Sequence, residues 1–409
     1  MKLHLSPPLT KKLDRSVAIT GSKSETNRLL LLQALFSDIS IENVSNSDDA
    51  QVMKNGLAIS KGEVDIHHAG TAMRFLTAYF ATQEGKEVVL TGSERMKERP
   101  IRVLVDALHA LGAEIEYVGE DGYPPLRIKG KKLTKNGVSL SANISSQYIS
   151  ALLLVAPSLA NGLDIGLIGK ITSVPYIKMT LALLDEIGVA TRFIDNTIRV
   201  FPKNEIAPKR LLVESDWSAA SYFYSVVALS AIGSELRLSS YKQGSLQGDS
   251  VLAQIYVHFG VDTTFSDATI ILTKARFHQD AVFDYDLSNA PDIAQTIAVT
   301  CFGLGLGCHL TGLHTLPIKE TDRLAAMKTE LEKFGGKVSI TEASLTLRPA
   351  TIEREEVSVD TYNDHRMAMA FAPLAMRVSF SVNDAGVVSK SYPDFWKDMK
   401  KIGLGVRDE

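Results

Sequence analysis

Lysine, arginine and hydroxyl side chains gather where the sequence changes from a strand pattern to a helix pattern. The stretch VAITGSKSETNRLLLLQAL (17–35) places Lys23, Ser24 and Arg28 between an apolar run ending at Gly21 and a strongly apolar helix pattern. Free N–H groups at a helix start, together with cations and hydroxyls, bind phosphate or carboxylate groups. The first glycine of a nucleotide P-loop is missing. The alternative is helix capping by Ser24 beside solvated cations.

Four further stretches in the first half of the chain have related features. They are HHAGTAMRFLTAYF (67–80), SERMKERPIRVL (93–104), SANISSQYISALLL (141–154) and ITSVPYIKMTL (171–181). Glycine allows a ligand to approach the backbone closely, and uncharged donors suit sugar-like hydroxyls or phosphate oxygens. The candidate residues in these stretches are Gly70, Arg99, Ser145, Ser146, Gln147, Ser173 and Tyr176. A solvated basic loop is the alternative for residues 93–104.

The second half of the chain adds carboxylates to the cations. Asp292 lies just inside a largely apolar helix pattern, where an aspartate usually interacts with the helix dipole. In LPIKETDRLAAM (316–327), a helix would bring Lys319, Glu320 and Arg323 to one face, although a surface ion-pair helix explains this motif equally well. The other candidates are Arg366, in YNDHRMAMA (362–370), and Lys390, in GVVSKSYPDFW (386–396). Cationic helix starts in both halves fit two domains closing on one multiply anionic ligand.

Composition narrows the function classes. The chain has 44 Lys plus Arg against 47 Asp plus Glu, a net charge of -3, which disfavours a nucleic-acid-binding protein. Its two cysteines, Cys301 and Cys308, lie in an apolar stretch and supply neither a disulfide framework nor a four-ligand zinc set. We therefore expect no metal and no cofactor. No run approaches membrane-span length and no signal peptide precedes the first motif, so we expect a cytoplasmic protein.

A repeated unit indicates the elements that position these residues. An amphipathic helix pattern ends at a glycine and is followed by two strand patterns, in four copies with Gly112, Gly188, Gly260 and Gly335. These glycines are 76, 72 and 75 residues apart (188-112, 260-188, 335-260). Weaker copies occur near Gly56 and Gly403. Six helix-plus-sheet units predict an α/β protein built from α+β repeats, with two domains of three units each.

The motifs, taken in order, resemble one family. They are GSKSETNR, AGTAMR, RMKERPI, SSQY, SVPYI, PDIAQTIA, KETDR, YNDHRMAMA and KSYPDFW. The chain resembles the EPSP synthases (3-phosphoshikimate 1-carboxyvinyltransferases), which are enolpyruvyl transferases. The resemblance implies transfer of the enolpyruvyl group of phosphoenolpyruvate to the 5-hydroxyl of shikimate 3-phosphate, in the shikimate pathway to chorismate and aromatic amino acids. It also implies a monomer with one domain from residues 21–214, another from 1–20 and 215–409, and an active site in the cleft between them.

The same resemblance implies residue roles. The shikimate 3-phosphate site would use Lys23, Ser24, Arg28, Ser145, Ser146, Gln147, Ser173, Tyr176, Asp292 and Lys319. The phosphoenolpyruvate site would use Lys23, Gly70, Arg99, Gln147, Arg323, Arg366 and Lys390. We expect catalysis from Asp292 as the base at the hydroxyl, Glu320 as the acid at the methylene, Lys23 at the leaving phosphate, and Lys319 with Arg323 at the charge of the ketal intermediate.

Three positions depart from the family's usual residues: His68 and Thr315 replace asparagine, and Phe75 replaces proline. Gly70 is retained, so we expect the inhibitor glyphosate to bind. One alternative is the related transferase acting on UDP-N-acetylglucosamine, but its reactive cysteine is missing from residues 93–102. Another is an inactive anion-binding homologue. Such a protein should have lost at least one of the principal charged residues Lys23, Asp292, Glu320 and Arg366, which are all present.

Overall fold

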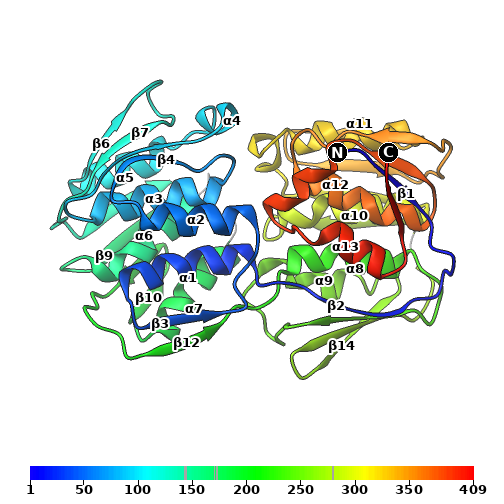
Figure 1. The fold of residues 1–409 in the computed structure, drawn as a ribbon, viewed down its shortest axis with the longest axis horizontal. Helices are drawn as coiled ribbons and strands as arrows, with labels where there is room; N and C mark the ends of the chain where they lie inside the picture. The colour runs from blue at the N-terminus through cyan, green and yellow to red at the C-terminus, as the bar shows by residue number, and fades with distance from the viewer. Residues whose placement is uncertain (142–144, 170, 172–173, 279–280) are drawn as a thin grey trace. The chain divides into compact units, whose positions relative to one another are not determined.

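The computed structural model describes residues 1–141, 145–169, 171, 174–278 and 281–409. The chain divides into two compact units (Figure 1). Unit 1 comprises Met1–Thr20 and Glu214–Glu409, and unit 2 comprises Gly21–Val213. Each unit has its own hydrophobic core. Glu214 is grouped with unit 1, one residue before the predicted boundary, and its carboxylate accepts hydrogen bonds from Trp217 Nε1 and Lys242 N of that unit.

Unit 2 alternates helices with short strands. Its helices are α1 (Lys23–Leu35), α2 (Asp48–Ala58), α3 (Gly70–Thr82), α4 (Glu94–Lys97), α5 (Arg102–Leu111), α6 (Ser146–Val155) and α7 (Val174–Glu186). Its strands are β3 (Ile39–Glu42), β4 (Lys61–Asp65), β5 (Glu87–Thr91), β6 (Glu114–Tyr117), β7 (Leu126–Lys129), β8 (Gly137–Ser141), β9 (Leu163–Ile168), β10 (Thr191–Ile194), β11 (Thr197–Val200) and β12 (Lys209–Leu212).

Unit 1 follows the same alternation. Its helices are α8 (Trp217–Ala228), α9 (Leu252–Ile255), α10 (Ala294–Leu304), α11 (Arg323–Lys333), α12 (His365–Phe371) and α13 (Phe395–Lys401), with short 3-10 turns η2 (Gly248–Val251), η3 (Pro291–Ile293), η4 (Leu316–Ile318), η5 (Ala372–Met376) and η6 (Ala385–Lys390). Its strands are β1 (Leu3–Ser6), β2 (Asp14–Ala18), β13 (Glu235–Ser239), β14 (Val261–Ser266), β15 (Thr269–Lys274), β16 (Val282–Asp286), β17 (Gly307–Thr311), β18 (Lys337–Ile340), β19 (Leu345–Arg348), β20 (Val357–Val359), β21 (Phe380–Val382) and β22 (Gly405–Asp408).

The strands repeat one pairing scheme. Among the described residues they form six sheets, three in each unit. In β4-β5-β7-β6 the first pair is parallel and the next two pairs are antiparallel, and the same holds for β8-β9-β11-β10, β2-β13-β15-β14, β16-β17-β19-β18 and β20-β21-β1-β22. The sixth sheet is the parallel pair β3 and β12. The predicted α/β class with repeated helix-plus-sheet units is confirmed.

The repeat has a local cause at its glycines. Gly112, Gly188, Gly260 and Gly335 have φ of 101°, 80°, 77° and 102°. Residues with a Cβ rarely adopt this left-handed conformation, so each glycine turns the chain into the following strand. Gly112 is the C-cap of α5, and Gly335 directly follows the C-cap of α11. The predicted helix up to Gly260 is wrong, because α9 already ends at Ile255 and turn residues lead from there to Gly260.

The N-terminal segment completes unit 1. Strand β1 lies between β21 and β22 and is antiparallel to both, while β2 lies parallel to β13. Figure 1 shows the blue N-terminal strand beside the red C-terminal strand. The first twenty residues therefore belong with the end of the chain.

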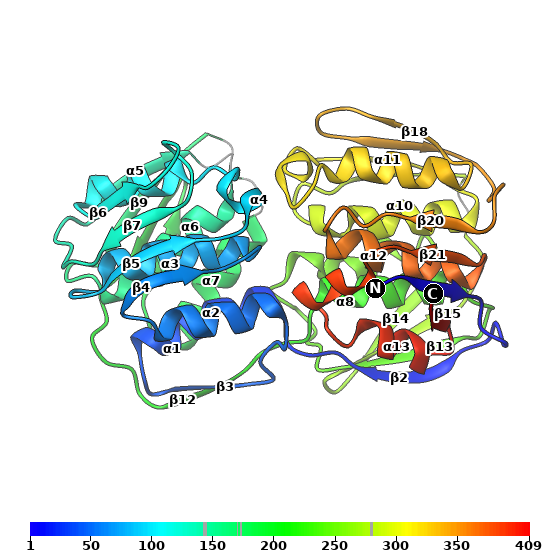
Figure 2. The same ribbon diagram turned by 45° about the horizontal axis from the view of Figure 1, so that its top comes forward.

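Buried helices form the centre of each unit. In unit 2, α1, α3 and α6 pack against one another, and in unit 1, α10 packs against α8, α11 and α12 (Figure 2). Every residue of α12 is buried, and so is every residue of α3 except Thr71 and Thr82. Helices that are buried on nearly all sides lie inside the core of their unit. The candidate residues lie mostly at the N-terminal ends of these helices or in the turns just before them.

Candidate active site

Lys23 is the first residue of α1, and its partner comes from α2. Lys23 Nζ lies 3.4 Å from the Asp49 carboxylate, which is 4 % exposed. The N-cap of α1 is Ser22, so Ser24 lies within the first turn and does not cap the helix. This differs from the capping alternative considered for Ser24.

Arg28 joins three helices of unit 2. It is 2 % exposed, and it donates through Nε to Thr180 Oγ1 of α7 at 2.8 Å and through Nη2 to Ser150 Oγ of α6 at 3.1 Å. Nη1 donates to the backbone oxygen of Ser24 at 2.7 Å, and Nη2 lies 3.4 Å from the backbone oxygen of Tyr176. Burial lowers the pKa of Arg28 to about 10. Ser24, Arg28 and Tyr176 are therefore brought together.

Gly70 is the first residue of α3, and it lies next to the guanidinium of Arg99. A Cβ at position 70 would lie 2.7 Å from Arg99 Nη1, closer than real Cβ atoms pack. Arg74, one turn further along α3, donates to the backbone oxygens of Gly70 at 3.3 Å and Pro100 at 3.1 Å. The buried Arg74 thus ties the segment carrying Arg99 to the start of α3, a role that the sequence analysis did not assign.

The start of α6 holds three of the predicted residues. Ser145 is the N-cap, and its hydroxyl accepts from Gln147 N at 3.3 Å. Ser146, the first helical residue, is 6 % exposed. Gln147 Nε2 donates to Thr71 Oγ1 of α3 at 3.2 Å. These contacts join α6 to the helix that begins at Gly70. Ser173, also predicted, lies outside the described residues.

Arg323 is the centre of the cluster in unit 1. Its Nε is 2.7 Å from Asp364 Oδ2, Nη1 is 3.0 Å from Asp292 Oδ1, and Nη2 is 2.8 Å from Glu320 Oε2. Its side chain is only 2 % exposed. Burial alone would lower its pKa, but the three carboxylates raise it. One guanidinium therefore fixes the positions of three carboxylates.

Asp292 lies among cations. It precedes α10 in the turn η3, and besides Arg323 it contacts Arg366 Nη2 at 3.2 Å and Lys319 Nζ at 3.7 Å. Its side chain is 17 % exposed, so part of it can reach a ligand. Asp292, Lys319 and Arg366 are predicted site residues, and the fold brings them together from three separate segments.

Glu320 forms ion pairs with two cations, Arg323 and Lys390. Lys390 Nζ donates to its Oε1 at 2.6 Å, and both side chains are largely buried. Helix α11 begins only at Arg323, with Asp322 as its N-cap, so Lys319 and Glu320 precede the helix. The shared helical face considered for these residues is therefore wrong, although Arg323 and Glu320 still pair.

The polar residues Asp364, His365 and Arg366 lie at the start of α12. Asp364 is the N-cap, accepting from Arg366 N at 2.9 Å, and it also binds Arg323. His365 is 1 % exposed, and its Nδ1 lies 3.5 Å from Asp364 Oδ1. The run thus begins the helix and anchors Arg323, while Arg366 contacts Asp292.

Asp249 and Ser218 belong to this cluster but were missed. Ser218 Oγ donates to the Asp249 carboxylate, and Arg366 Nη2 lies 3.4 Å from the same hydroxyl. Burial, followed by the charge of Asp292, raises the pKa of Asp249 to about 7. The signal available in the sequence was only an aspartate in the turn GSLQGDS (244–250), which resembles many surface turns.

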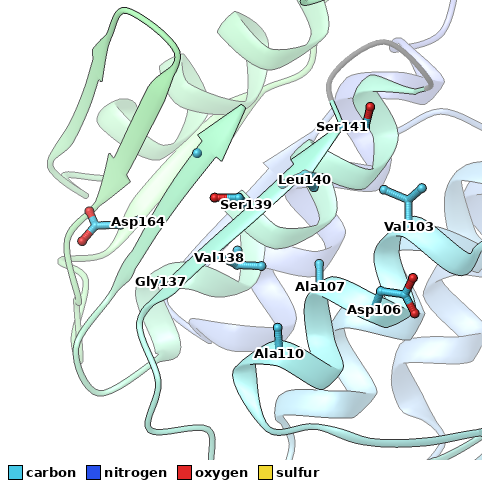
Figure 3. A pocket seen from close by; sticks show the side chains of 11 residues that line it. Val103, Asp106, Ala107, Ala110, Gly137, Val138, Ser139, Leu140, Ser141 and Asp164 are labelled. Atoms are coloured by element: carbon cyan, nitrogen blue, oxygen red, sulfur yellow. The ribbon is translucent and has the colours of Figure 1, made fainter. Parts of the chain in front are cut away.

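A groove elsewhere on unit 2 does not share this chemistry. Figure 3 shows it between α5 and β8, with a volume of about 660 Å³. Among the described residues its lining includes the carboxylates Asp106 and Asp164 but no lysine, arginine or histidine. An anionic substrate would meet no compensating charge there.

Comparison with known proteins identifies the family. The family model described as EPSP synthase (3-phosphoshikimate 1-carboxyvinyltransferase) matches residues 55–399. The 3-phosphoshikimate 1-carboxyvinyltransferase of Bacteroides fragilis strain YCH46 is 43 % identical over 415 residues, covering 100 % of this chain and 99 % of its own. The chain belongs to the EPSP synthase family. The family predicted from the nine motifs is confirmed.

Relatives with lower sequence identity also match along nearly the whole chain. The enzyme of Aliivibrio salmonicida is 36 % identical over 424 residues, covering 96 % of this chain and 98 % of its own. The structure of EPSP synthase from Acinetobacter baumannii has a TM-score of 0.79 at 19 % identity, and each chain is covered completely. The enolpyruvyl transferase NikO from Streptomyces tendae has a TM-score of 0.75 at 14 % identity, with 99 % and 98 % covered. These two structures support the fold. None of the helices in the described ranges is long and apolar enough to cross a membrane.

Proposed function

We propose that this EPSP synthase family member transfers the enolpyruvyl group of phosphoenolpyruvate to the 5-hydroxyl of shikimate 3-phosphate and releases phosphate. Each substrate carries a phosphate and a carboxylate, so the pair brings about four anionic groups to the protein. Such ligands need arginine forks and lysine point charges. Both units supply these groups, so one copy of the chain carries every proposed role, and we propose that the monomer is active.

We propose that unit 2 binds shikimate 3-phosphate. Arg28 is buried among neutral acceptors, and Ser24, Ser145, Ser146 and Tyr176 surround the starts of the same packed helices. Arginine supplies charge for the phosphate, while the serines suit its oxygens and the ring hydroxyls. Ser173, Lys23 and Gln147 of the same unit, with Asp292 and Lys319 of unit 1, complete the proposed set.

For phosphoenolpyruvate, we propose Gly70, Arg99 and Gln147 in unit 2 with Arg323, Arg366 and Lys390 in unit 1. Gly70 leaves space that Arg99 occupies, because any Cβ there would collide with the guanidinium. In unit 1, Arg366 forms an ion pair with Asp292, and Lys390 forms one with Glu320. We propose that both cations also bind the anionic groups of phosphoenolpyruvate.

The observation that carries the proposal is the bridge made by Arg323. This guanidinium holds Asp292 and Glu320 at 3.0 Å and 2.8 Å from adjacent nitrogens. Addition needs a base at the 5-hydroxyl and an acid at the methylene carbon. We assign Asp292 as the base and Glu320 as the acid, oriented by a shared buried cation. In elimination the methyl group formed returns a proton as the C–O bond to phosphate breaks.

The addition and elimination steps also suggest roles for the remaining charged residues. The new C–O bond gives a ketal that keeps both the carboxylate and the phosphate. Lys319 and Arg323 would stabilise that intermediate, and Lys23 would stabilise the leaving phosphate. Lys23 lies at a helix N-terminus, where backbone N–H groups also favour an anion.

The test is phosphate release from phosphoenolpyruvate by the purified protein. We expect release only when shikimate 3-phosphate is present, and none with UDP-N-acetylglucosamine. Asp292→Asn and Glu320→Gln should each lower kcat by at least about a hundredfold, the scale of general acid–base catalysis, while the variants still bind shikimate 3-phosphate. Asp284→Asn, a change on the exposed strand β16, serves as the control. Full activity in Glu320→Gln would contradict the acid assignment.

A further inference from the structure

The ring of Phe75 lies against the guanidinium of Arg28, a contact that the proposed function does not use. Arg28 Cζ is 5.4 Å from the centroid of the Phe75 ring, and Phe75 is 0 % exposed. The ring of Tyr176 lies 5.9 Å from the same carbon. Both distances are within the range of about 6 Å over which an aromatic ring attracts a cation. Two rings therefore contribute to the surroundings of this arginine.

Arg28 needs such contacts because it is a cation removed from water. In the described part of the chain no carboxylate forms an ion pair with it, and its hydrogen-bond acceptors are hydroxyls and backbone oxygens. The charge of Glu25 attracts Arg28 electrostatically, but burial has the larger effect on the pKa of Arg28. A cation–π contact gains strength when the cation is desolvated, so the ring of Phe75 matters more here than at a surface.

We propose that Phe75 is a positioning residue for shikimate 3-phosphate, with its ring holding the Arg28 guanidinium in the orientation that binds this substrate. This inference rests on the role proposed above for Arg28. Position 75 is one of the three departures noted in the sequence, where the resembling family commonly has proline. Proline has no aromatic face, so α3 supplies a contact here that the usual residue does not.

The competing explanation is that Phe75 only fills the core of unit 2. Phe80 provides a matched comparison. It lies on the same helix, is also 0 % exposed and belongs to the same core, but the cation near its ring is Lys86. Replacing either phenylalanine with leucine removes similar apolar volume. Only the change at position 75 removes a ring from Arg28.

The experiment compares Phe75→Leu with Phe80→Leu by calorimetric titration of shikimate 3-phosphate without phosphoenolpyruvate. We expect Phe75→Leu to weaken binding by about 3- to 30-fold, the range of one desolvated cation–π contact, and to raise KM for shikimate 3-phosphate but not for phosphoenolpyruvate. Phe80→Leu should lower the melting temperature similarly and change the affinity less than about twofold, since it leaves Arg28 intact. Phe75→Tyr should retain binding.

Equal affinities in Phe75→Leu and Phe80→Leu would overturn the inference. If Phe75→Leu does not fold, Phe75→Met and Phe75→Tyr make the same comparison, because methionine keeps the volume without the ring.

The variant Arg28→Gln distinguishes a failure of this inference from a failure of the proposed function. Unchanged binding in Arg28→Gln would refute the role of Arg28 itself. Where Arg28→Gln does weaken binding, adding Phe75→Leu to it should cause no further loss, and a further loss would show that Phe75 acts elsewhere.

Discussion

Single residues determine how much space and charge the candidate site offers. Gly70 and Asp249 are examples from the two units. At Gly70 the missing side chain makes room for Arg99, and at Asp249 burial removes a carboxylate from water beside Asp292 and Arg366. Each effect can be tested by a change of one or two atoms.

Gly70→Ala should weaken phosphoenolpyruvate binding selectively. The added Cβ would lie 2.7 Å from Arg99 Nη1, so the flexible guanidinium must move from its place at the start of α3. We expect KM for phosphoenolpyruvate to rise by about tenfold or more, the scale of one lost charged hydrogen bond, with shikimate 3-phosphate affinity within about twofold. Steady-state kinetics measure the first and titration the second. Gly137→Ala is the control, because nothing lies within 4 Å of its added Cβ.

Asp249→Asn should change how stability depends on pH. The folded pKa is raised from 3.8 to about 7, so between these values the folded protein keeps a proton that the unfolded chain has lost. The contribution of Asp249 to stability therefore falls as pH rises from about 4 to about 7 and is constant above that range.

Asparagine resembles the protonated acid and does not titrate. Relative to the parent, Asp249→Asn should be more stable at pH 8 than at pH 5, with a difference of about 1–3 kcal/mol from about 1.4 kcal/mol per pKa unit. Urea unfolding at the two pH values measures this. Asp106→Asn, on the exposed side of α5, controls for a general charge effect. The same pH dependence in parent and Asp249→Asn would contradict the burial argument.

At the scale of elements, helix starts both end the preceding loop and position charged groups. Asp322 begins α11 and Asp364 begins α12, each by accepting from a backbone N–H. Asp364 also binds Arg323 and is 0 % exposed, whereas Asp322 is exposed. The two caps therefore have the same local role but different long-range roles. This difference allows the ion pair to be measured separately from the cap.

Asp364→Asn should destabilise unit 1 far more than Asp322→Asn. Asparagine caps helices as well as aspartate, so both variants keep their helix starts. Only Asp364→Asn leaves the buried Arg323 with fewer compensating charges, a loss of about 3–5 kcal/mol for a broken buried pair. Chemical unfolding gives the two free energies. Equal losses in both variants would show that the pair with Arg323 adds nothing to the cap.

At the scale of the whole molecule, the order of the chain differs from the order of the fold. Unit 2 is continuous, but unit 1 is assembled from both ends of the chain. Strand β1 is an interior strand of the sheet β20-β21-β1-β22. Loss of an interior strand leaves the backbone groups of both its neighbours unpaired, which is costly for a buried sheet.

A chain beginning at Pro7, without β1, should therefore lose the cooperative fold of unit 1 while unit 2 remains folded. Hydrogen exchange should show protected amides in residues 21–213 and weak protection in residues 214–409, and activity should be absent. A chain in which the initiator methionine precedes Leu3 keeps β1 and is the control. Normal protection of β21 and β22 in the shortened chain would contradict the role given to β1.

The sequence by itself predicted those features of the structure that depend on residues close to one another in the chain. Apolar spacing, capping residues and glycines after helices lie within a few residues of one another, so the repeat and the helix starts carrying Lys23, Gly70 and Ser145 could be predicted. Nine motifs in order also identified the family. The helix considered across Lys319 and Glu320 does not form, because α11 begins only after its N-cap Asp322.

Tertiary structure alone decided the partners. Arg323 meets Asp364 across 41 positions, and Arg28 meets Thr180 across 152. No local spacing encodes such pairs, because they depend on how whole helices pack. The same reason explains Asp249, an ordinary turn aspartate until the fold buries it beside Asp292, and Phe75, an apolar helix residue until packing brings its ring to a buried arginine. Interactions between neighbouring residues determine which segments form helices and strands. The packing of these helices and strands determines which side chains contact one another.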